Sequence, residues 1–322
     1  MSEHSLPSRA ADVPASRKDD QEKIKTNRLA QKNRRKYFLQ KFTPEIRKAL
    51  LKMPLQIFMM TVCLMIPSIF GNYSFAGSVP EVEKKSAPSS PQRLYDQSRA
   101  LTKNHELLKA QEILQKILDD DPDFENIEAV QKDLQALNLG IILSDVPIPQ
   151  TIIYKVRPRD TLIKLARKFH TTVEVIQKRN HLDSDMIRNG QKLSIYNSPF
   201  NILIDKSDNI LMLKNGERIL KVYPVATGKE TTTTPIGEFT IKDRLVDPVW
   251  FHHGSVVPPG TPKNFLGTRW LGFNLPKYGI HGTVQPELIG KSVSGGCVRM
   301  RNSDVEELYT LIPEGTKVII KE

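Results

Sequence analysis

Two side chains near the end of the sequence could do nucleophilic chemistry together. Cys297 follows two glycines, and His281 lies sixteen positions before it. A thiol attacks as the thiolate, and a neighbouring imidazole can take its proton and later protonate a leaving group. Gly295 and Gly296 have no side chain, so the backbone can bend there and direct N–H groups at a developing oxyanion. The pattern favours a nucleophilic cysteine; a buried thiol and a structural histidine are the alternative.

Cysteine usage strengthens the nucleophile interpretation. The sequence has two cysteines, and Cys63 lies inside an apolar run, so Cys297 has no expected disulfide partner. If that run sends the downstream chain across a membrane into an oxidising compartment, a lone thiol is a liability unless its reactivity is useful.

The net charge of +11 is concentrated at the N-terminus. Residues 1–52 hold 14 Lys and Arg and 6 Asp and Glu, so this arm carries 14 − 6 = +8. The rest of the chain holds 47 − 14 = 33 basic and 36 − 6 = 30 acidic residues, a near balance that provides no basic face for nucleic acid. The sequence predicts a disordered, cytoplasmic arm over residues 1–52 and no nucleic-acid partner.

An uncharged, almost wholly apolar run follows the arm, from Met53 to Phe70. A helix of this length can cross the hydrocarbon core of a bilayer. Residues 53–76 are therefore expected to form a single transmembrane helix that anchors the chain in the cytoplasmic membrane, with the later domains in the periplasm or cell envelope. Small residues up to Ala76 also suit a signal peptidase, so a secreted protein cleaved near Ala76 is the alternative.

A linker and a helical hairpin are expected next. Residues 77–91 are rich in Pro, Ser and charge, which is typical of a flexible linker. Residues 92–145 show helical periodicity on both sides of Asp121-Pro122 and predict a tetratricopeptide-like hairpin. No second copy follows, so a spacer packed on a neighbouring domain is expected, with a protein-binding role as the alternative.

Residues 151–196 predict a compact strand–helix–helix–strand unit that resembles a LysM module. The matching positions are Tyr154, Val156, Asp160, Thr161, Leu162, Asn180, Gly190, Gln191 and Leu193. The family implies a small α+β fold that binds N-acetylglucosamine-containing glycan such as peptidoglycan. Arg159 departs from the family, which usually has Gly before the Asp.

The resemblance also implies which LysM residues contact the glycan. LysM modules bind mostly through the loop after the first strand and the loop after the second helix. By position, the glycan-binding residues in this sequence are Asp160, Thr161, Leu162, Met186, Ile187, Arg188 and Asn189.

From residue 198 the sequence becomes rich in β-strand patterns, and Asn215-Gly216 is a strong hairpin signal. Residues 198–322 resemble the L,D-transpeptidase catalytic domain, also called the YkuD domain. The matching stretches are ATGK, TPIGEFTI, NFLGTRWLGF, YGIHGT and SGGCVRM. The family implies a mostly β fold, a β-sandwich, and no cofactor.

The resemblance implies a peptidoglycan transpeptidase. Cys297 would be the nucleophile and His281 the general base and acid. The backbone carbonyl of Gly282 would orient the imidazole, and the N–H groups of Gly296 and Cys297 would bind the oxyanion. The thiolate would attack the diaminopimelate–D-Ala bond of a stem tetrapeptide, form a thioester, and pass the acyl group to an amine of another stem or of a wall-linked protein.

Two further residues are expected near the thiol. Ser294 would hydrogen-bond close to the site. Arg299 would hold a substrate carboxylate or lower the thiol pKa by its charge, with a structural ion pair as the alternative. Gly295 stands where the family varies among His, Lys and Ser, so acceptor choice or reactivity could differ here.

Three other functions remain open from the sequence. If water replaces the amine, the same acyl-enzyme makes an L,D-carboxypeptidase or a murein amidase. A non-catalytic peptidoglycan anchor would use the same modules without the chemistry. A zinc site built from His252, His253, His281 and Cys297 would need a fixed geometry that adjacent histidines on a strand do not favour, and the sequence predicts no metal.

Overall fold

The computed structural model describes residues 90–252 and 254–322. The predictions for the arm 1–52, the apolar segment 53–76 and most of the linker therefore lie outside the described residues. Within the described ranges, no helix is long and apolar enough to cross a membrane. These residues belong to one compact unit.

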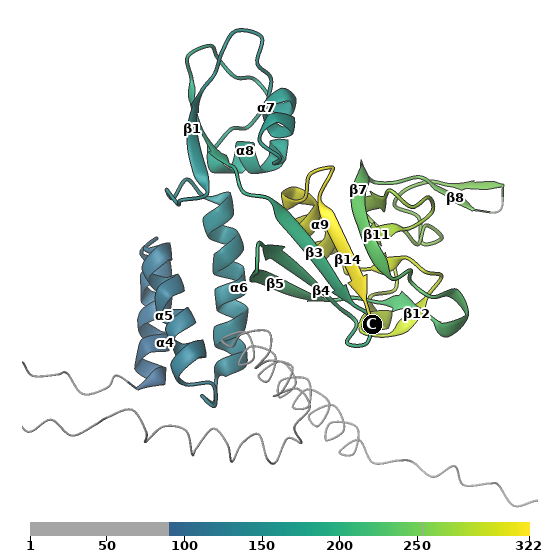
Figure 1. Cartoon of the computed structure of the whole chain (residues 1–322), viewed down its shortest axis with the longest axis horizontal. Coiled ribbons are helices and arrows are strands. Elements are labelled where there is room, and N and C mark those ends of the chain that lie inside the picture. Colours follow the sequence, from purple (N-terminus) through teal and green to yellow (C-terminus); the bar gives the residue numbers. More distant parts are fainter. Residues whose placement is uncertain (1–89, 253) are drawn as a thin grey trace, which may run out of the picture. The chain divides into compact units, whose positions relative to one another are not determined.

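Three helices begin the described chain, where a two-helix hairpin was expected over 92–145. They are α4 (Pro91–Lys103), α5 (Leu107–Asp120) and α6 (Ile127–Leu143) (Figure 1). Ser90 caps α4 by accepting the N–H of Arg93, so the linker expected over 77–91 ends one residue earlier. The periodicity missed α4 because few of its residues are apolar. Its buried Tyr95 donates to Asp133 of α6 at 2.8 Å.

The next element group has the expected strand–helix–helix–strand order. It consists of β1 (Thr151–Lys155), α7 (Leu162–Lys168), α8 (Val173–Arg179) and β2 (Lys192–Tyr196). The two strands pair antiparallel. Each helix starts at a threonine whose side chain accepts a backbone N–H, Thr161 for α7 and Thr172 for α8. These caps stop the chain from continuing as strand and turn it into helix.

Most of the remaining strands form one eight-stranded sheet, in the order β13-β11-β10-β7-β14-β3-β4-β5. Its members are β3 (Phe200–Asp205), β4 (Ile210–Asn215), β5 (Arg218–Pro224), β7 (Gly237–Val246), β10 (Arg269–Phe273), β11 (Gly279–His281), β13 (Val298–Arg299) and β14 (Lys317–Lys321). Short strands pair beside it: β6 (Thr227–Gly228) with β12 (Ser292–Ser294), and β8 (Trp250–His252) with β9 (Ser255–Val257). Single 3-10 turns lie at Glu230–Thr232 and Pro286–Leu288.

The eight-stranded sheet has two halves, which were expected from the sequence as the two sheets of a sandwich. Strand β7 belongs to both halves of the sheet, because its first residues pair with β14 and the rest pair with β10. A register shift between Gly272 and Phe273 accompanies this change of partner. The hydrogen bonding therefore runs from one half to the other through β7, a shared strand that the alternating pattern of the sequence does not predict.

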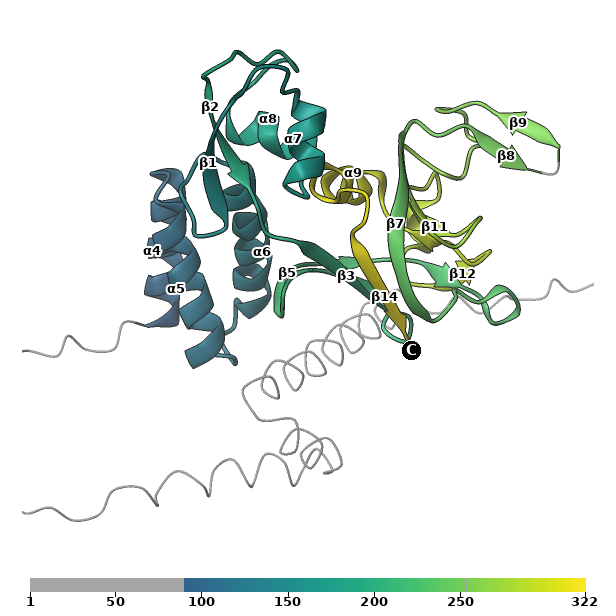
Figure 2. The same ribbon diagram turned by 45° about the horizontal axis from the view of Figure 1, so that its top comes forward.

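Helix α9 (Asn302–Leu311) lies between this sheet and the helices α7 and α8 (Figure 2). Its buried residues Val305, Leu308 and Leu311 join the main hydrophobic core, together with Ile142 of α6 and Val175 of α8. Residues of all three element groups therefore reach the main core, while the helices α4–α6 and the βααβ module each also have a hydrophobic core of their own.

A buried arginine connects the helices to the βααβ module. Arg179, fully buried, donates to the carbonyl oxygens of Ile141, Ile142 and Val146 and to Oγ of Ser194, at 2.7–3.1 Å. The first two carbonyls lie at the C-terminal end of α6, where helix carbonyls lack partners and a cation is favoured. On the catalytic side, Asn138 of α6 donates to the carbonyl of Leu220 at 3.0 Å.

Candidate active site

Strand pairing brings His281 and Cys297 to neighbouring positions. Strand β11 runs parallel to β13, with Ile280 opposite Val298 and His281 opposite Arg299. Cys297 directly precedes β13. Because side chains alternate along a strand, Cys297 lies on the same face as Arg299, diagonal to His281. The sixteen-residue interval of the sequence is thus a connection between two adjacent strands.

The imidazole of His281 is held in one tautomer. The ring is buried, and its Nδ1 lies 2.7 Å from the carbonyl oxygen of Gly282. A carbonyl oxygen can only accept, so Nδ1 carries the hydrogen and Nε2 presents a lone pair. Burial lowers the pKa of His281 to about 4, and the charge of Arg299 acts in the same direction, against the Gly282 bond. Near neutral pH the ring is an uncharged base.

The indole of Trp270 supports this ring from the neighbouring strand. Trp270 faces His281 across the β10–β11 pair, and their rings stack with centroids 5.8 Å apart. The indole also occupies the space above Gly272 and Gly279, where a Cβ would lie 2.6 and 2.9 Å from indole atoms. Sequence reasoning missed this residue as part of the site, although it lies in the NFLGTRWLGF stretch.

The thiol of Cys297 is partly buried and uncharged at neutral pH. Its Sγ lies 3.3 Å from the carbonyl oxygen of Lys277. Burial raises the pKa of the Cys297 thiol, while a backbone hydrogen bond at Gly279 and the charge of Arg299 oppose that rise. A neutral thiol beside a neutral imidazole favours proton transfer during attack over a thiolate–imidazolium pair formed in advance.

Arg299 is a half-buried cation that has no acidic partner among the residues that the structure describes. Burial lowers the pKa of its guanidinium, and its buried Nε has no hydrogen-bond partner among the described residues. None of the ion pairs in that part of the chain includes Arg299. The structural ion pair considered from the sequence is thus absent there, which leaves the guanidinium free to meet a negatively charged group beside the thiol.

A buried serine shapes the turn before the thiol. Ser294 is fully buried; its Oγ donates to the carbonyl of Cys297 at 2.6 Å and accepts the N–H of Gly296 at 3.1 Å. Of the two expected oxyanion donors, the Gly296 N–H is thus already engaged in a local serine–backbone bond. None of the hydrogen bonds among the described residues uses the N–H of Cys297.

The first loop expected to bind glycan mainly stabilises its own module. The side chain of Leu162 is buried in the core, so it cannot contact a glycan as expected. Asp160 accepts from the hydroxyl of Tyr154 and from the N–H of Arg157, and Thr161 caps α7. Core packing leaves the same sequence signature as a binding loop, which explains the misassignment of Leu162, while the glycan contacts of Asp160 and Thr161 stay predictions.

The second expected loop forms a cavity. Met186, Arg188 and Asn189 line a space of about 510 Å³ together with Gln191. Met186 is highly exposed. Ile187 is partly buried and packs against the module's core. This loop has the exposed apolar and polar groups that a glycan site needs.

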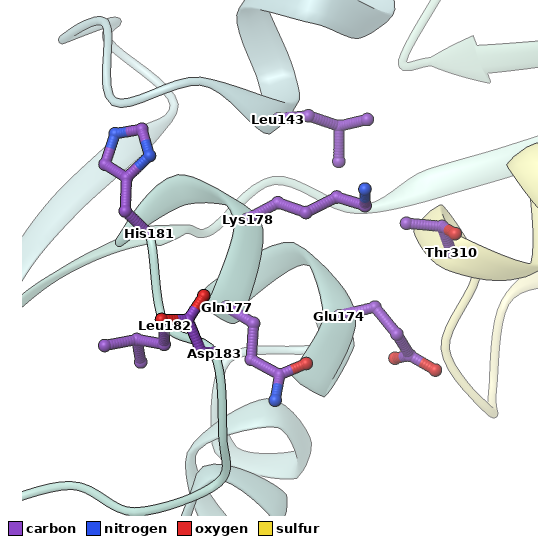
Figure 3. Close-up of a pocket in the computed structure, with 8 residues that line it drawn as sticks. All are labelled: Leu143, Glu174, Gln177, Lys178, His181, Leu182, Asp183 and Thr310. Atoms are coloured by element: carbon purple, nitrogen blue, oxygen red, sulfur yellow. The ribbon is translucent and has the colours of Figure 1, made fainter.

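A second cavity, of about 610 Å³, lies where α8 approaches α9 (Figure 3). Its lining consists of Leu143, Glu174, Gln177, Lys178, His181, Leu182, Asp183 and Thr310. None of the residues predicted to act in catalysis or glycan binding is among them.

The zinc alternative stays untested, because two of its four candidate ligands have side chains outside the described part of the chain. No group of three or more His, Cys, Asp or Glu side chains there lies close enough together to hold a metal ion. The side chains of His252 and His253, two of the residues considered for such a site, are not among those described.

Comparisons with known proteins identify two domains. The family model for the LysM domain matches residues 154–195, and the model for the L,D-transpeptidase catalytic domain matches residues 199–320. The boundaries coincide with the βααβ module and with the domain that contains the eight-stranded sheet.

Curated relatives match this chain over a third to a half of its length. The L,D-transpeptidase YkuD of Bacillus licheniformis is 37% identical over 176 residues, which is 52% of this chain and 98% of the relative. The L,D-transpeptidase YqjB of Bacillus subtilis is 39% identical over 126 residues, 38% of this chain and 70% of the relative. A solved L,D-transpeptidase from Mycobacterium smegmatis matches with a TM-score of 0.34 and 16% identity, over 41% of this chain and 64% of that one, less than two thirds of its length.

Proposed function

Since the chain belongs to the L,D-transpeptidase family, we propose that it cross-links peptidoglycan by moving the acyl group of a stem peptide from D-Ala to an amine. It is a cysteine-dependent acyltransferase. The observation that carries the proposal is the pairing of β11 with β13, which puts Cys297 beside His281 while Nε2 of the ring stays available as a base. The LysM domain ahead of the catalytic domain supports peptidoglycan as the substrate.

The first half of the reaction is acylation. Nε2 of His281 takes the thiol proton of Cys297 as Sγ attacks the carbonyl carbon of the diaminopimelate–D-Ala bond. The tetrahedral intermediate collapses with cleavage of that C–N bond. The imidazolium returns the proton to the leaving amine, D-Ala departs, and a thioester remains on Sγ. The hydrogen bond from Nδ1 to the carbonyl of Gly282 keeps the ring oriented, so that Nε2 can exchange the proton during both steps of acylation.

The second half transfers the acyl group. An amine of another stem, or of a wall-linked protein, attacks the thioester and loses a proton to His281; the C–S bond breaks, and the leaving Cys297 thiolate takes that proton from the imidazolium. The N–H of Cys297 is the candidate oxyanion donor in both halves, since the Gly296 N–H is used within the turn. Attack by water instead would make a carboxypeptidase or amidase of the same site.

The reaction products distinguish a transpeptidase from a hydrolase and from a non-catalytic anchor. The full chain is incubated with stem tetrapeptides, and the products are followed by mass spectrometry. Cross-linked dimers with release of D-Ala are expected. Free tripeptide without dimers would assign the hydrolase, and no turnover with intact peptidoglycan binding would assign the non-catalytic anchor.

Arg299 binds the carboxylate of the donor stem and tunes the two reacting groups. Its charge lowers the pKa of both His281 and Cys297, so Arg299→Met is expected to raise both. The acid limb of kcat/KM follows protonation of His281, hence it moves upward from about pH 4. Loss of a charge-assisted hydrogen bond also raises KM, by about 10- to 100-fold.

Arg299→Lys provides the matched comparison. It keeps the positive charge, so the pH profile of kcat/KM should stay near that of the wild type, while the loss of the planar fork still raises KM. Unchanged KM and an unchanged pH profile in Arg299→Met would contradict both roles and leave a packing function.

The LysM module holds the glycan strand through the loop of residues 186–189. The cavity lined by Met186, Arg188 and Asn189 supports this assignment. The double variant Met186→Ser, Arg188→Ser is expected to reduce co-sedimentation of the full chain with insoluble peptidoglycan by about tenfold. Arg167→Ser removes an exposed charge from α7 of the same module and serves as the control. Equal co-sedimentation of the double variant and the control would argue against this loop.

The catalytic domain acts outside the cytoplasm, anchored by residues 53–76. The support is the apolar run preceded by a basic arm, a pattern that keeps the arm in the cytoplasm. Protease added to intact spheroplasts should digest the domain at 198–322 and spare the arm. Digestion only after lysis would contradict this orientation, and a mature chain that begins after Ala76 would favour the secreted alternative.

The three helices α4, α5 and α6 act as a support for the catalytic domain. Gln135 accepts the N–H of Val222 at 3.0 Å, and Asn138 accepts from Arg218 at 2.9 Å, so α6 holds strand β5 through polar bonds. A protein partner for these helices stays a prediction from the sequence, and co-purification with cross-linking from cell envelopes would test it.

A further inference from the structure

One side-chain oxygen connects two loops that are far apart in the sequence. Oδ1 of Asn302, the first residue of α9, accepts the N–H of Thr283 at 3.0 Å and the N–H of Thr268 at 3.3 Å. The first loop follows β11, and the second precedes β10. A single amide carbonyl with two lone pairs suits this arrangement.

Both loops contact the imidazole of His281. The loop after β11 provides the Gly282 carbonyl that takes the Nδ1–H at 2.7 Å. In the loop before β10, the backbone of Leu266 makes a second hydrogen bond with the same ring, which raises the pKa of His281 as the Gly282 carbonyl does. The backbone groups that fix the ring therefore lie one or two residues from the two N–H groups that Asn302 holds.

The glycines of these loops make room for the Asn302 oxygen. A Cβ at Gly267 would lie 2.3 Å from Oδ1, and a Cβ at Gly282 would lie 2.1 Å from it. Gly267 also has φ +64°, which disfavours other residues. A residue with a Cβ at either glycine would therefore prevent its loop from approaching the Asn302 side chain this closely.

We propose that Asn302 is a positioning residue of the acyl-transfer site, which holds the loops at 266–268 and 282–283 so that His281 keeps its hydrogen on Nδ1 and its lone pair on Nε2. The proposal rests on the proposed function for its effect on turnover, whereas its effect on the ring of His281 is independent of any substrate. Asn302 touches neither substrate nor thiol and acts only through the backbone around the imidazole.

Two variants with similar volumes test the proposal in the full chain. Asn302→Asp keeps an acceptor oxygen for both N–H groups, and Asn302→Leu removes it. Asn302→Leu is expected to lower kcat by about 100-fold, because small displacements of a catalytic group have effects of that size, with little change in KM. Asn302→Asp is expected to retain kcat within about threefold.

The ring itself is observed by NMR in protein labelled with 15N-histidine. The Nδ1–H signal of His281, identified by its loss in His281→Gln, should persist in Asn302→Asp and broaden or vanish in Asn302→Leu. This readout stands even if the wild type releases no D-Ala, so failure of the proposed function and failure of this proposal are distinguishable.

Thr268→Val is the matched control. It removes the bond from Thr268 Oγ1 to Glu306 on α9, at 2.6 Å, but leaves both N–H bonds to Asn302. Its Nδ1–H signal should match the wild type. If Asn302→Leu does not fold, Asn302→Gln takes its place, since it moves the carbonyl by one methylene. A folded Leu or Gln variant with wild-type kcat and an unchanged His281 signal would overturn the proposal.

Discussion

Replacing Cys297 with alanine is expected to lower the rate of D-Ala release from a stem tetrapeptide by about 10,000-fold or more. Without the thiol no thioester forms, and His281 has no proton to take. The measurement is the initial rate of D-Ala release by the full chain, together with the mass of the intact protein during turnover. The wild type should accumulate the acyl adduct on Cys297, and the variant should not.

Two comparisons separate lost chemistry from a damaged fold. Cys63→Ser removes the other cysteine of the sequence, which lies in the apolar run, and should leave the rate unchanged. His281→Gln should lower the rate by about 1,000-fold or more, because the residues of such a pair act as a unit. Turnover by Cys297→Ala within about tenfold of the wild type would overturn the nucleophile assignment.

A carbapenem gives an independent readout of the same thiol. By the family resemblance, the strained lactam carbonyl is attacked as the stem amide is, and Cys297 gains the mass of the drug. Because burial keeps the thiol protonated, adduct formation should need His281 and be slowed in His281→Gln. An adduct that forms equally fast without the imidazole would mean that Cys297 reacts as a free thiolate.

The parts of the site that sequence alone could predict depend on short-range patterns. Cys297 and His281 stand in motifs a few residues long, and the two glycines directly before Cys297 predict the turn that presents its thiol. The βααβ module was likewise predictable, since Thr161 and Thr172 cap its helices locally and the apolar residues of each helix follow one stripe. In each case the physical cause acts within about one turn of the residue concerned.

The parts that sequence could not predict depend on register and long-range contacts. Asn302 reaches backbone groups 19 and 34 residues away, which no local pattern encodes. Trp270 faces His281 only because β10 and β11 pair in one register. Helix α4 was missed because its few apolar residues suffice only when α5 and α6 supply the rest of the core. The use of the Gly296 N–H depends on where Oγ of Ser294 points, which composition does not determine.

The two glycines before the thiol differ in whether the structure leaves room for a side chain at their position. Gly296 is buried with φ +116°, and a Cβ there would lie 2.8 Å from the ring of Tyr278. Gly295 is exposed, and a Cβ there would meet nothing within 4 Å. The position at which the family varies is therefore the one that tolerates a side chain, and the sequence departure at Gly295 leaves the turn itself intact.

Gly296→Ala is accordingly expected to lower the rate of D-Ala release by about 100-fold, since it displaces the adjacent Sγ. The strained φ and the contact with Tyr278 should also lower the free energy of unfolding by about 2–3 kcal/mol. Gly295→Ala is the matched control and should retain both the rate and the stability. Chemical denaturation gives the stability, and the rate is measured well below the unfolding midpoint so that the two effects are separate.

The comparison also decides what the turn contributes to catalysis. If Gly296→Ala loses stability but keeps its rate, the Ser294–Gly296 bond only stabilises the fold, and Sγ is positioned by β13 alone. If the rate falls at 20 °C in a fully folded variant, the turn itself aims the thiol at the carbonyl carbon. We expect the second result, because Ser294 bonds both to the Gly296 N–H and to the carbonyl of Cys297, so any shift of the glycine reaches the nucleophile through one rigid side chain.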